Sequence, residues 1–284
     1  MQHVEFFHKD HFEKFYHRVY PKGQLSHFID FFWETKFDSL WLRYPNGFSD
    51  ALFPNVGYTY LINLGTPFVM QVDEEKFEMK GDGFLPRATS IECYHSEGNQ
   101  LFGIKFRISP VIFEKQVDFS EYQEYIFPLS YLLDEKLIGR VKSAPSFEKR
   151  VKILSSHYLS IIEKHAASFD SIRIVTEILE KASKENNFCT PIELLAQEAG
   201  ISSRTLQRYF EKATGISSKK ALQIMRIRKA VAHLANDPDS FHYSKYGYYD
   251  HSHFYKHLKE FLHKQTLVHL RPHLRLLKNA ASFS

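Results

Sequence analysis

The sequence predicts an α+β protein, in which a β-rich, barrel-like N-terminal domain with trailing helices precedes an all-α C-terminal domain. The chain has 284 residues, which exceeds the usual size of one domain. Strand-like alternation occurs between Trp41 and Ile108, whereas the residues after about 170 repeat with a helical period and carry helix caps. We therefore expect one domain over residues 1–166 and a second over residues 170–284.

The N-terminal part is expected to form strands first and helices afterwards. Runs rich in β-branched and aromatic residues, bounded by Gly, Pro, Asn and Asp, predict strands at 58–63, 68–72, 90–94 and 101–106. From Pro110 onward the period becomes helical again. We expect helices at 129–141 and 147–164, and the joint between the domains at 166–170.

The composition is that of an ordinary globular protein, with 43% hydrophobic and 25% charged residues. The two cysteines, Cys93 and Cys189, form no CxxC pair, so we expect neither a zinc knuckle nor a redox motif, and a reduced cytoplasmic setting fits best. The N-terminus mixes acids, bases and histidines, and no later run reaches 18 apolar residues. We expect no secretion signal and no membrane span.

Positive charge is concentrated in the C-terminal part. Residues 1–170 contain 19 Lys and Arg against 23 Asp and Glu, a balance of −4, and residues 171–284 contain 18 against 10, a balance of +8. Eight bases lie between Arg204 and Lys229, with Glu211 as the single acid. Such a field attracts a polyanion, although an isolated basic run is more often only a solvated helix face.

Two short helices separated by a tight turn are predicted at 190–214. Thr190 is the expected N-cap of the first helix, Pro191 its first residue and Gly200 its end. Ser202 is the expected N-cap of the second helix, which ends at Gly215. A helix, a glycine turn and a helix give the helix-turn-helix outline.

The second of these helices has an apolar stripe, formed by Leu206, Phe210 and Ala213. Its opposite face carries side chains of the types that pair with guanine and adenine edges in a major groove, namely Arg204, Gln207 and Arg208. The geometry of this helix alone does not distinguish a helix that contacts DNA bases from an ordinary amphipathic helix, and the two interpretations are equally supported.

Residues 194–234, LLAQEAGISSRTLQRYFEKATGISSKKALQIMRIRKAVAHL, resemble the first half of the AraC-type DNA-binding domain. A leucine-alanine helix, a Ser-capped R-T-L-Q-R recognition helix, a Gly-x-Ser turn and a long R-x-R-K-A helix follow in the family's order. The resemblance implies a transcriptional regulator, most commonly an activator, whose partners are double-stranded DNA and RNA polymerase.

A long connecting helix is predicted from its N-cap Ser217 to about Ala235, before Pro238, with a buried stripe of Ile224, Ile227, Val231 and Leu234. Its roughly 19 residues span about 28 Å, close to the about 34 Å of one turn of B-DNA. A helix of this length would place the recognition helices of two DNA-binding units side by side.

A second unit is predicted at 247–262. Its apolar and basic positions repeat those of the first unit with an offset of 48 residues, which pairs Leu206 with Phe254, Phe210 with Leu258 and Arg208 with Lys256. The string GYYDHSHF at 247–254 resembles the signature of the AraC family's second unit.

The resemblance also implies which residues bind DNA. The base-facing positions would be Arg204, Gln207 and Arg208 in the first unit, and His251, Ser252 and Lys256 in the second. Lys212 would contact phosphate, which fixes position without carrying sequence information.

The second unit departs from the family pattern. Its supporting helix is usually rich in Ile and Ala, but residues 241–246 read FHYSKY, and the usual glycine and proline beyond the recognition helix are His263 and Thr266. We hypothesise that the first unit dominates recognition. A protein that acts mainly through protein partners, with a degenerate second unit, is the alternative.

The sequence predicts neither a metal site nor an enzyme active site. His253 and His257 are spaced i, i+4 with His251 nearby, but no acid or cysteine completes a metal set. We expect His253 to pack with Phe254, and His257 to face solvent or phosphate. Neither a metal nor another cofactor is expected. Nor is an enzyme, because GxSxG, P-loop and GxGxxG motifs are absent and His95 lacks the His-x-His of a cupin metal site.

The N-terminal half resembles, more loosely, an uncharacterised domain fused to AraC-type regulators, through PKGQL and FFWE, YLINLG and LFGIKFR in that order. This implies a sensor or dimerisation domain, and hence a small-molecule effector or a homodimer, without naming the ligand. Its aromatic residues Trp33, Trp41, Tyr58 and Tyr60 would either line a pocket or fill a core, and for each of them a core position is favoured.

Overall fold

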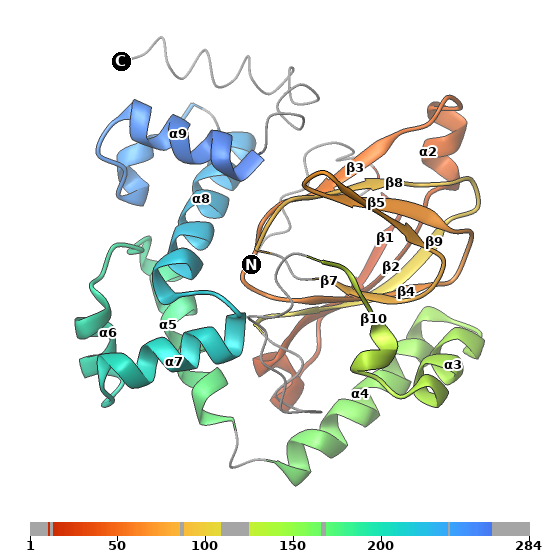
Figure 1. Ribbon diagram of the computed structural model, residues 1–284, viewed down its shortest axis with the longest axis horizontal. Coiled ribbons are helices and arrows are strands. Elements are labelled where there is room, and N and C mark those ends of the chain that lie inside the picture. Colours follow the sequence, from red (N-terminus) through yellow and green to blue (C-terminus); the bar gives the residue numbers. More distant parts are fainter. Residues whose placement is uncertain are drawn as a thin grey trace.

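The computed structural model describes residue 11 and residues 14–85, 88–108, 125–165, 169–237 and 239–262. Strands and two packed helices form the N-terminal part, and further helices form the C-terminal part beside it (Figure 1). This confirms the predicted fold class. No helix within the described ranges is both long and apolar enough to cross a membrane.

The strands form two antiparallel sheets rather than one closed barrel. The larger sheet has the order β1-β2-β9-β4-β7-β10, and the smaller has the order β3-β8-β5-β6. The strands are β1 (Tyr16–Val19), β2 (Ile29–Lys36), β3 (Ser49–Leu52), β4 (Thr59–Asn63), β5 (Phe68–Val72), β6 (Glu75–Met79), β7 (Gly83–Leu85), β8 (Ile91–Tyr94), β9 (Gln100–Phe106) and β10 (Phe127–Pro128). All four predicted strands are present, as β4, β5, β8 and β9.

Alternation along β4 divides the core of this domain into two layers. Leu61 packs between the two sheets, whereas Tyr60 and Ile62 pack on the other face of the larger sheet, against helices. The sequence reading missed β2, because seven of its eight residues are buried and the alternation that marks a half-exposed strand is absent.

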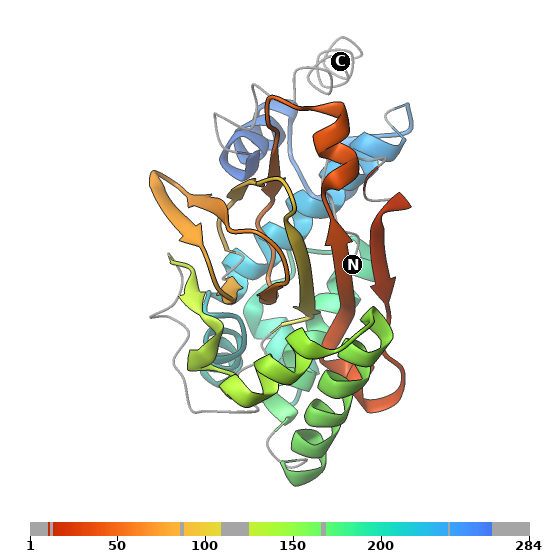
Figure 2. The ribbon, with the colours of Figure 1, turned by 90° about the vertical axis from the view of Figure 1, so that its right-hand side faces the viewer.

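The helices α3 (Glu135–Ser143) and α4 (Phe147–Lys164) cover that other face of the larger sheet (Figure 2). The expected helix at 147–164 is confirmed. The expected helix at 129–141 is wrong at its start, because residues Leu129–Tyr131 form a 3-10 turn, η4, and α3 begins only after Asp134. The Asp134 carboxylate accepts hydrogen bonds from the Lys136 and Leu137 amides, which fixes that start. Two shorter helices, η1 (Gly23–His27) and α2 (Asp38–Arg43), flank β2.

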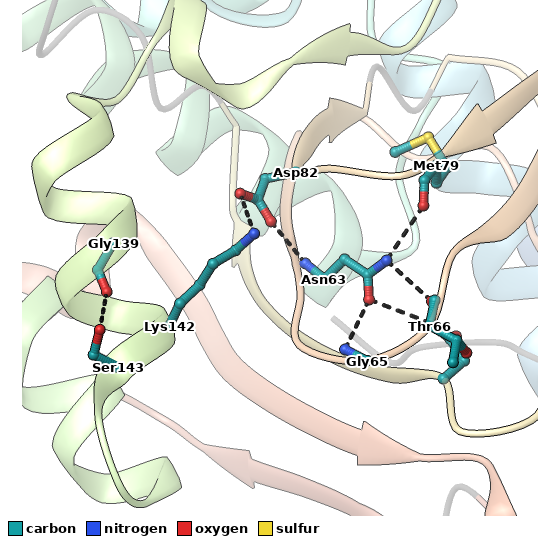
Figure 3. A network of polar contacts seen from close by, with 9 residues as sticks. Asn63, Gly65, Thr66, Met79, Asp82, Gly139, Lys142 and Ser143 are labelled. Carbon is teal, nitrogen blue, oxygen red and sulfur yellow. Dashed lines mark hydrogen bonds and ion pairs between the residues drawn. The ribbon is translucent and has the colours of Figure 1, made fainter.

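A polar network joins α3 to the turn between β4 and β5 (Figure 3). The Asp82 carboxylate accepts a hydrogen bond from the backbone N–H of Asn63 at 2.9 Å and forms an ion pair with Lys142 of α3, also at 2.9 Å. The Asn63 side chain donates to the carbonyls of Thr66 and Met79. The network therefore fixes the edge of one sheet, a turn and a covering helix relative to one another.

The C-terminal part consists of helices. They are α5 (Asp170–Glu185), α6 (Ile192–Glu198), α7 (Ser203–Thr214), α8 (Ser218–Asn236), the 3-10 helix η6 (Tyr243–Tyr246) and α9 (His251–Leu262). The predicted caps at Ser202 and Ser217 are confirmed, and so are the ends at Gly200 and Gly215, whose φ angles are +68° and +73°. The expected cap at Thr190 is wrong by one residue, because Pro191 is the N-cap of α6.

The two parts share contacts along α5 and α8. Phe169 and Ile172, at the start of α5, pack in the core of the N-terminal part, whereas Val175 and later residues of α5 pack among α6, α7 and α8. Residues 166–168 of the expected joint lie outside the described residues. The domain limits therefore stay a prediction.

Candidate nucleic-acid interface

The α7 helix presents an exposed basic face. The Ser202 hydroxyl accepts a hydrogen bond from the Thr205 amide at 3.1 Å and thereby caps the helix. On one side, Leu206, Phe210 and Ala213 are completely buried, which confirms the predicted apolar stripe. On the other side lie three exposed bases, Arg204, Arg208 and Lys212. The helix is thus held by its apolar stripe, with its charges in solvent.

Gln207 behaves differently from these neighbours. It is half-buried, and its amide nitrogen donates to Glu211 at 2.8 Å while its amide oxygen accepts from Ser218 at 2.9 Å. The side chain therefore ties α7 to the first turn of α8. Base reading by Gln207 stays a prediction, and it requires that these two hydrogen bonds be exchanged for bonds to a base.

The α9 helix repeats the arrangement. Asp250 caps it by accepting a hydrogen bond from the His253 amide at 2.7 Å. Phe254 and Leu258 are buried, at 2% and 1% exposed. The side chains expected to meet DNA lie differently, with Ser252 and Lys256 exposed and His251 half-buried against the Tyr255 ring, at 6.0 Å between centroids. Buried and basic positions thus recur with the predicted offset.

The support of the second unit is a single 3-10 turn, η6, where the first unit has the α-helix α6. Aromatic packing strengthens it, since Phe241 stacks on Tyr246 and contacts Phe254. His233 of α8 lies 2.8 Å from the Tyr246 hydroxyl. Residues 241–246 are therefore irregular, as the sequence indicates, yet they are packed. His263 and Thr266 lie outside the described residues.

Three of the eight bases between 204 and 229 do not contribute to an exposed field. Arg226 and Arg228 are buried, at 7% and 5% exposed, and Lys229 donates to the Ser183 carbonyl near the end of α5. The predicted run of eight bases thus contains two buried residues, Arg226 and Arg228, and one half-buried residue, Lys229. Arg228 stands four residues after Ile224 and three before Val231, so the helical period itself places it on the buried stripe. The remaining five are Arg204, Arg208, Lys212, Lys219 and Lys220.

Arg226 is the centre of a cluster that the sequence reading missed. Its guanidinium lies 4.3 Å from the centroid of the Tyr248 ring and 3.1 Å from Nδ1 of His257. Burial, and then the Arg226 charge, lower the pKa of His257. Burial raises the pKa of Tyr248 to about 12. His257 is half-buried beside Arg226, so the expectation that it faces solvent or phosphate stays a prediction. The His253 ring packs against the Tyr248 ring, at 5.2 Å between centroids, and its expected packing with Phe254 also stays a prediction.

The N-terminal part encloses a cavity of about 40 Å³ between its two sheets. Trp33 lines it together with buried polar side chains that include Asp50 and His95. His95 stacks on Phe37 at 3.6 Å between ring centroids. Of the other aromatic residues, Tyr60 lies in the core between the larger sheet and its helices, and Trp41 is half-buried against the core between the two sheets. Tyr58 is buried at the boundary of the two parts, where its hydroxyl donates to the Thr214 carbonyl at 3.4 Å.

A more open cleft of about 170 Å³ lies where the two parts meet. It is formed by Pro54 and residues 88–90 of the N-terminal part, and by residues of α8 and α9 that include Lys220, His257 and Phe261. No group of three His, Cys, Asp or Glu side chains suited to a metal ion occurs in the described part of the chain.

One family model matches the C-terminal part of this chain. A family model described as a helix-turn-helix domain matches residues 195–265. No curated protein matches the chain.

Among solved structures, the chain is similar to ToxT from Vibrio cholerae. A 1.65 Å structure of ToxT shares 10% identity over 76% of this chain and 90% of that chain, with a TM-score of 0.42. ToxT from Vibrio cholerae O395 shares 10% identity over 76% and 89%, with a TM-score of 0.43. Wild-type ToxT with a bound unsaturated fatty acid shares 11% identity over 76% and 87%, with a TM-score of 0.40.

The matched segment contains all of α7, α8 and α9, with the capped and buried positions described above. Residues 195–265 are therefore a helix-turn-helix domain, as the AraC-type resemblance of this segment predicts.

Proposed function

We propose that this protein is a sequence-specific DNA-binding transcriptional regulator that reads two adjacent major-groove segments. The observation that carries the proposal is the placement of α7 and α9 at opposite ends of α8, each with a buried apolar stripe and exposed bases (Figure 1). The 19 residues of α8 span about 28 Å, close to one turn of B-DNA. Two helices at this separation reach successive major grooves on one side of the duplex.

The side chains divide into those that read bases and those that hold the backbone. Arg204, Gln207 and Arg208 read the segment under α7, and His251, Ser252 and Lys256 read the segment under α9. Exposed Arg and Lys side chains can reach base edges at little cost, whereas Gln207 and His251 must first leave the contacts that hold them. Lys212 binds phosphate, which supplies affinity for any sequence.

The N-terminal part regulates this reading, through a small-molecule effector or through pairing of two chains. Its coupling to the DNA-binding part is supported by the hydrogen bonds from Arg228 and Tyr58 and by the stacking of Phe53 on Phe261, at 5.6 Å. A ligand held between the sheets, or in the cleft where the two parts meet, would bias the position of α8 and α9. Bound at a promoter in the cytoplasm, the protein recruits RNA polymerase and acts as an activator, and no catalytic step is needed.

The test is footprinting on DNA selected from a random library by the full chain. We expect two protected major-groove segments about one helical turn apart. Arg208→Ala should lose discrimination in one segment and Lys256→Ala in the other, each by about 1–3 kcal/mol. The loss should be smaller for Lys256→Ala, since the support of α9 is a single 3-10 turn.

The control for charge is the double variant Lys149→Ala, Lys152→Ala, which removes two exposed bases of α4 on the N-terminal part, one more than either single variant removes. It should leave both protected segments unchanged. Lys212→Ala should weaken binding to every sequence alike, and reduce the slope of log K against log salt by about one. The proposed function would be refuted by DNA binding without sequence preference. It would also be refuted if the α4 variant weakened DNA binding as much as Arg208→Ala does.

A further inference from the structure

Tyr249 is an exposed aromatic residue at the start of the second proposed reading helix. Its side chain is 91% exposed, the highest value among the large hydrophobic residues of the described part of the chain. It directly precedes Asp250, the N-cap of α9, and the exposed Ser252 follows three residues later. A single exposed aromatic residue is common on protein surfaces, so its position and its surroundings decide whether it has a role.

The turn that carries Tyr249 is longer than its counterpart in the first unit. In the first unit, one residue stands between the glycine and the N-cap, in GIS at 200–202. In the second unit, two residues stand there, in GYYD at 247–250. Both glycines have a left-handed φ, +68° and +74°, so the two turns correspond at this point. Tyr249 is therefore an added residue, placed immediately before the helix.

Tyr249 does not make the packing contact that its position usually provides. The residue before an N-cap often packs against the fourth residue of the helix, in a hydrophobic staple. In the first unit, Ile201 is partly buried against the core that contains Leu206. In the second unit, Phe254 holds the corresponding helix position, and the Tyr248 ring packs on it at 5.2 Å between centroids. The neighbouring residue thus makes the packing contact, and Tyr249 is left in solvent.

The residues around Tyr249 hold it in a defined place. Tyr248 is only 2% exposed, and the Arg226 guanidinium lies 4.3 Å from the centroid of its ring. On the other side, the Asp250 carboxylate accepts a hydrogen bond from the His253 amide at 2.7 Å. The backbone is anchored before and after Tyr249, so binding by its side chain requires little ordering of the backbone.

The chemistry at this end of α9 indicates which part of DNA the ring would meet. Residues at the N-terminal end of a recognition helix contact base edges in the major groove. The Asp250 carboxylate, next to Tyr249 in the chain, repels phosphate, whereas the tyrosine ring is neutral and largely apolar. The apolar group that base pairs present in the major groove is the methyl group of thymine. Tyr249 therefore fits a thymine better than it fits the DNA backbone.

We propose that Tyr249 is a further specificity-determining residue of the second unit, and that its ring packs on the methyl group of a thymine at the start of α9. This inference rests on the proposed function. The contact is uncharged, so it adds sequence discrimination without adding to the salt dependence of binding. It gives the second unit an apolar base contact beside the polar contacts assigned to Ser252 and Lys256.

The test replaces thymines by deoxyuridine, one at a time, in the DNA segment that α9 protects, and measures binding of the full chain. Deoxyuridine differs from thymidine only by the missing methyl group. At one position we expect the wild type to bind about fourfold more weakly, the effect of one methyl group that is no longer buried. Tyr249→Ala should bind thymine and deoxyuridine at that position equally. Tyr249→Phe should behave like the wild type, because the ring is kept.

Two controls separate this contact from general effects. Tyr131→Ala removes a tyrosine of the N-terminal part that is 54% exposed, and it should keep the wild-type preference for thymine. Tyr249→Ala should leave the slope of log K against log salt unchanged, whereas Lys212→Ala should reduce it, because only the lysine carries a charge.

Two outcomes would overturn the inference and leave the proposed function intact, provided that two DNA segments are protected. The first is a preference for thymine that is absent from the wild type or unchanged in Tyr249→Ala. The second is an equal loss of affinity in Tyr249→Phe and Tyr249→Ala, which would assign the effect to the hydroxyl and hence to a phosphate contact. Binding without any sequence preference would refute the proposed function, and this inference with it.

Discussion

Arg228 of α8 donates through Nη1 to the backbone carbonyl of Pro54 at 2.7 Å, across the boundary between the two parts of the protein. The same nitrogen lies 3.2 Å from the Phe53 carbonyl oxygen. A base from the middle of the connecting helix thus holds a loop of the N-terminal part. Because of this contact, a movement of α8 would move the Phe53–Pro54 loop of the N-terminal part, and the reverse.

Replacing Arg228 by methionine keeps much of the side-chain volume and removes the donor. We expect the free energy of unfolding to fall by about 2 kcal/mol or more, since buried carbonyls that lose a partner cost about 1–3 kcal/mol each. Urea unfolding monitored by circular dichroism measures the change. Arg173→Met is the control, because Arg173 is exposed and forms surface ion pairs with Asp170 and Glu177, and it should change stability by at most about 0.5 kcal/mol. Equal effects of the two variants would contradict this role of Arg228.

Gly200 should contribute to stability through its backbone, because its φ angle of +68° is unfavourable for alanine. Gly200→Ala meets no atom within 4 Å and should therefore show backbone strain alone, with a loss of about 1 kcal/mol. Gly139→Ala, in α3, also meets open space, but at an ordinary helical φ, and it should stabilise by about 0.5–1 kcal/mol. Thermal unfolding of both variants tests this difference in sign.

Ser202 sets the start of the proposed reading helix. Ser202→Ala removes the acceptor for the Thr205 amide and should cost about 0.5–2 kcal/mol. Ser203→Ala, one residue further on, leaves the cap intact and should be close to neutral. Denaturant midpoints of the two variants are the measurement, and a larger loss for Ser203→Ala would show that the cap does not control α7.

His257 should make stability depend on pH. Burial and the Arg226 charge lower its pKa below the ordinary 6.5, with Lys220 and His253 acting in the same direction and Glu260 opposing them. The unfolded chain therefore takes up this proton near pH 6.5 and the folded chain only at lower pH. Stability should fall as the pH drops through 6.5, and less so in His257→Gln, whose side chain still offers Arg226 an acceptor. Unfolding free energies at pH 7.5 and about pH 5.5 decide this, and identical losses in both proteins would contradict it.

Local chemistry explains which parts of the fold the sequence predicts well. Ser202 and Gly215 bound α7 to the residue, because a cap and a left-handed glycine act within one helical turn. Features that depend on contacts between residues distant in the sequence are harder to predict. Strand β2 is buried on both faces, so its eight residues lack the alternation that identifies a strand.

The same distinction holds within the proposed interface. The outward positions of Arg204, Arg208 and Lys212 follow from helical period alone. The roles of Arg226 and Arg228 do not, because their partners come from other elements, and for Arg228 from residues 174 and 175 positions away. The half-buried state of Gln207 depends in the same way on Ser218 of the next helix.

The central claim is that the exposed bases of α7 select the DNA sites of this protein. Its most direct test maps chromosomal occupancy of the wild type against the double variant Arg204→Ala, Arg208→Ala, with the α4 double variant Lys149→Ala, Lys152→Ala as the control for charge. We predict discrete sites that share one sequence for the wild type and the control, and their loss in the α7 variant. Unchanged site-specific occupancy in the α7 variant would contradict the account.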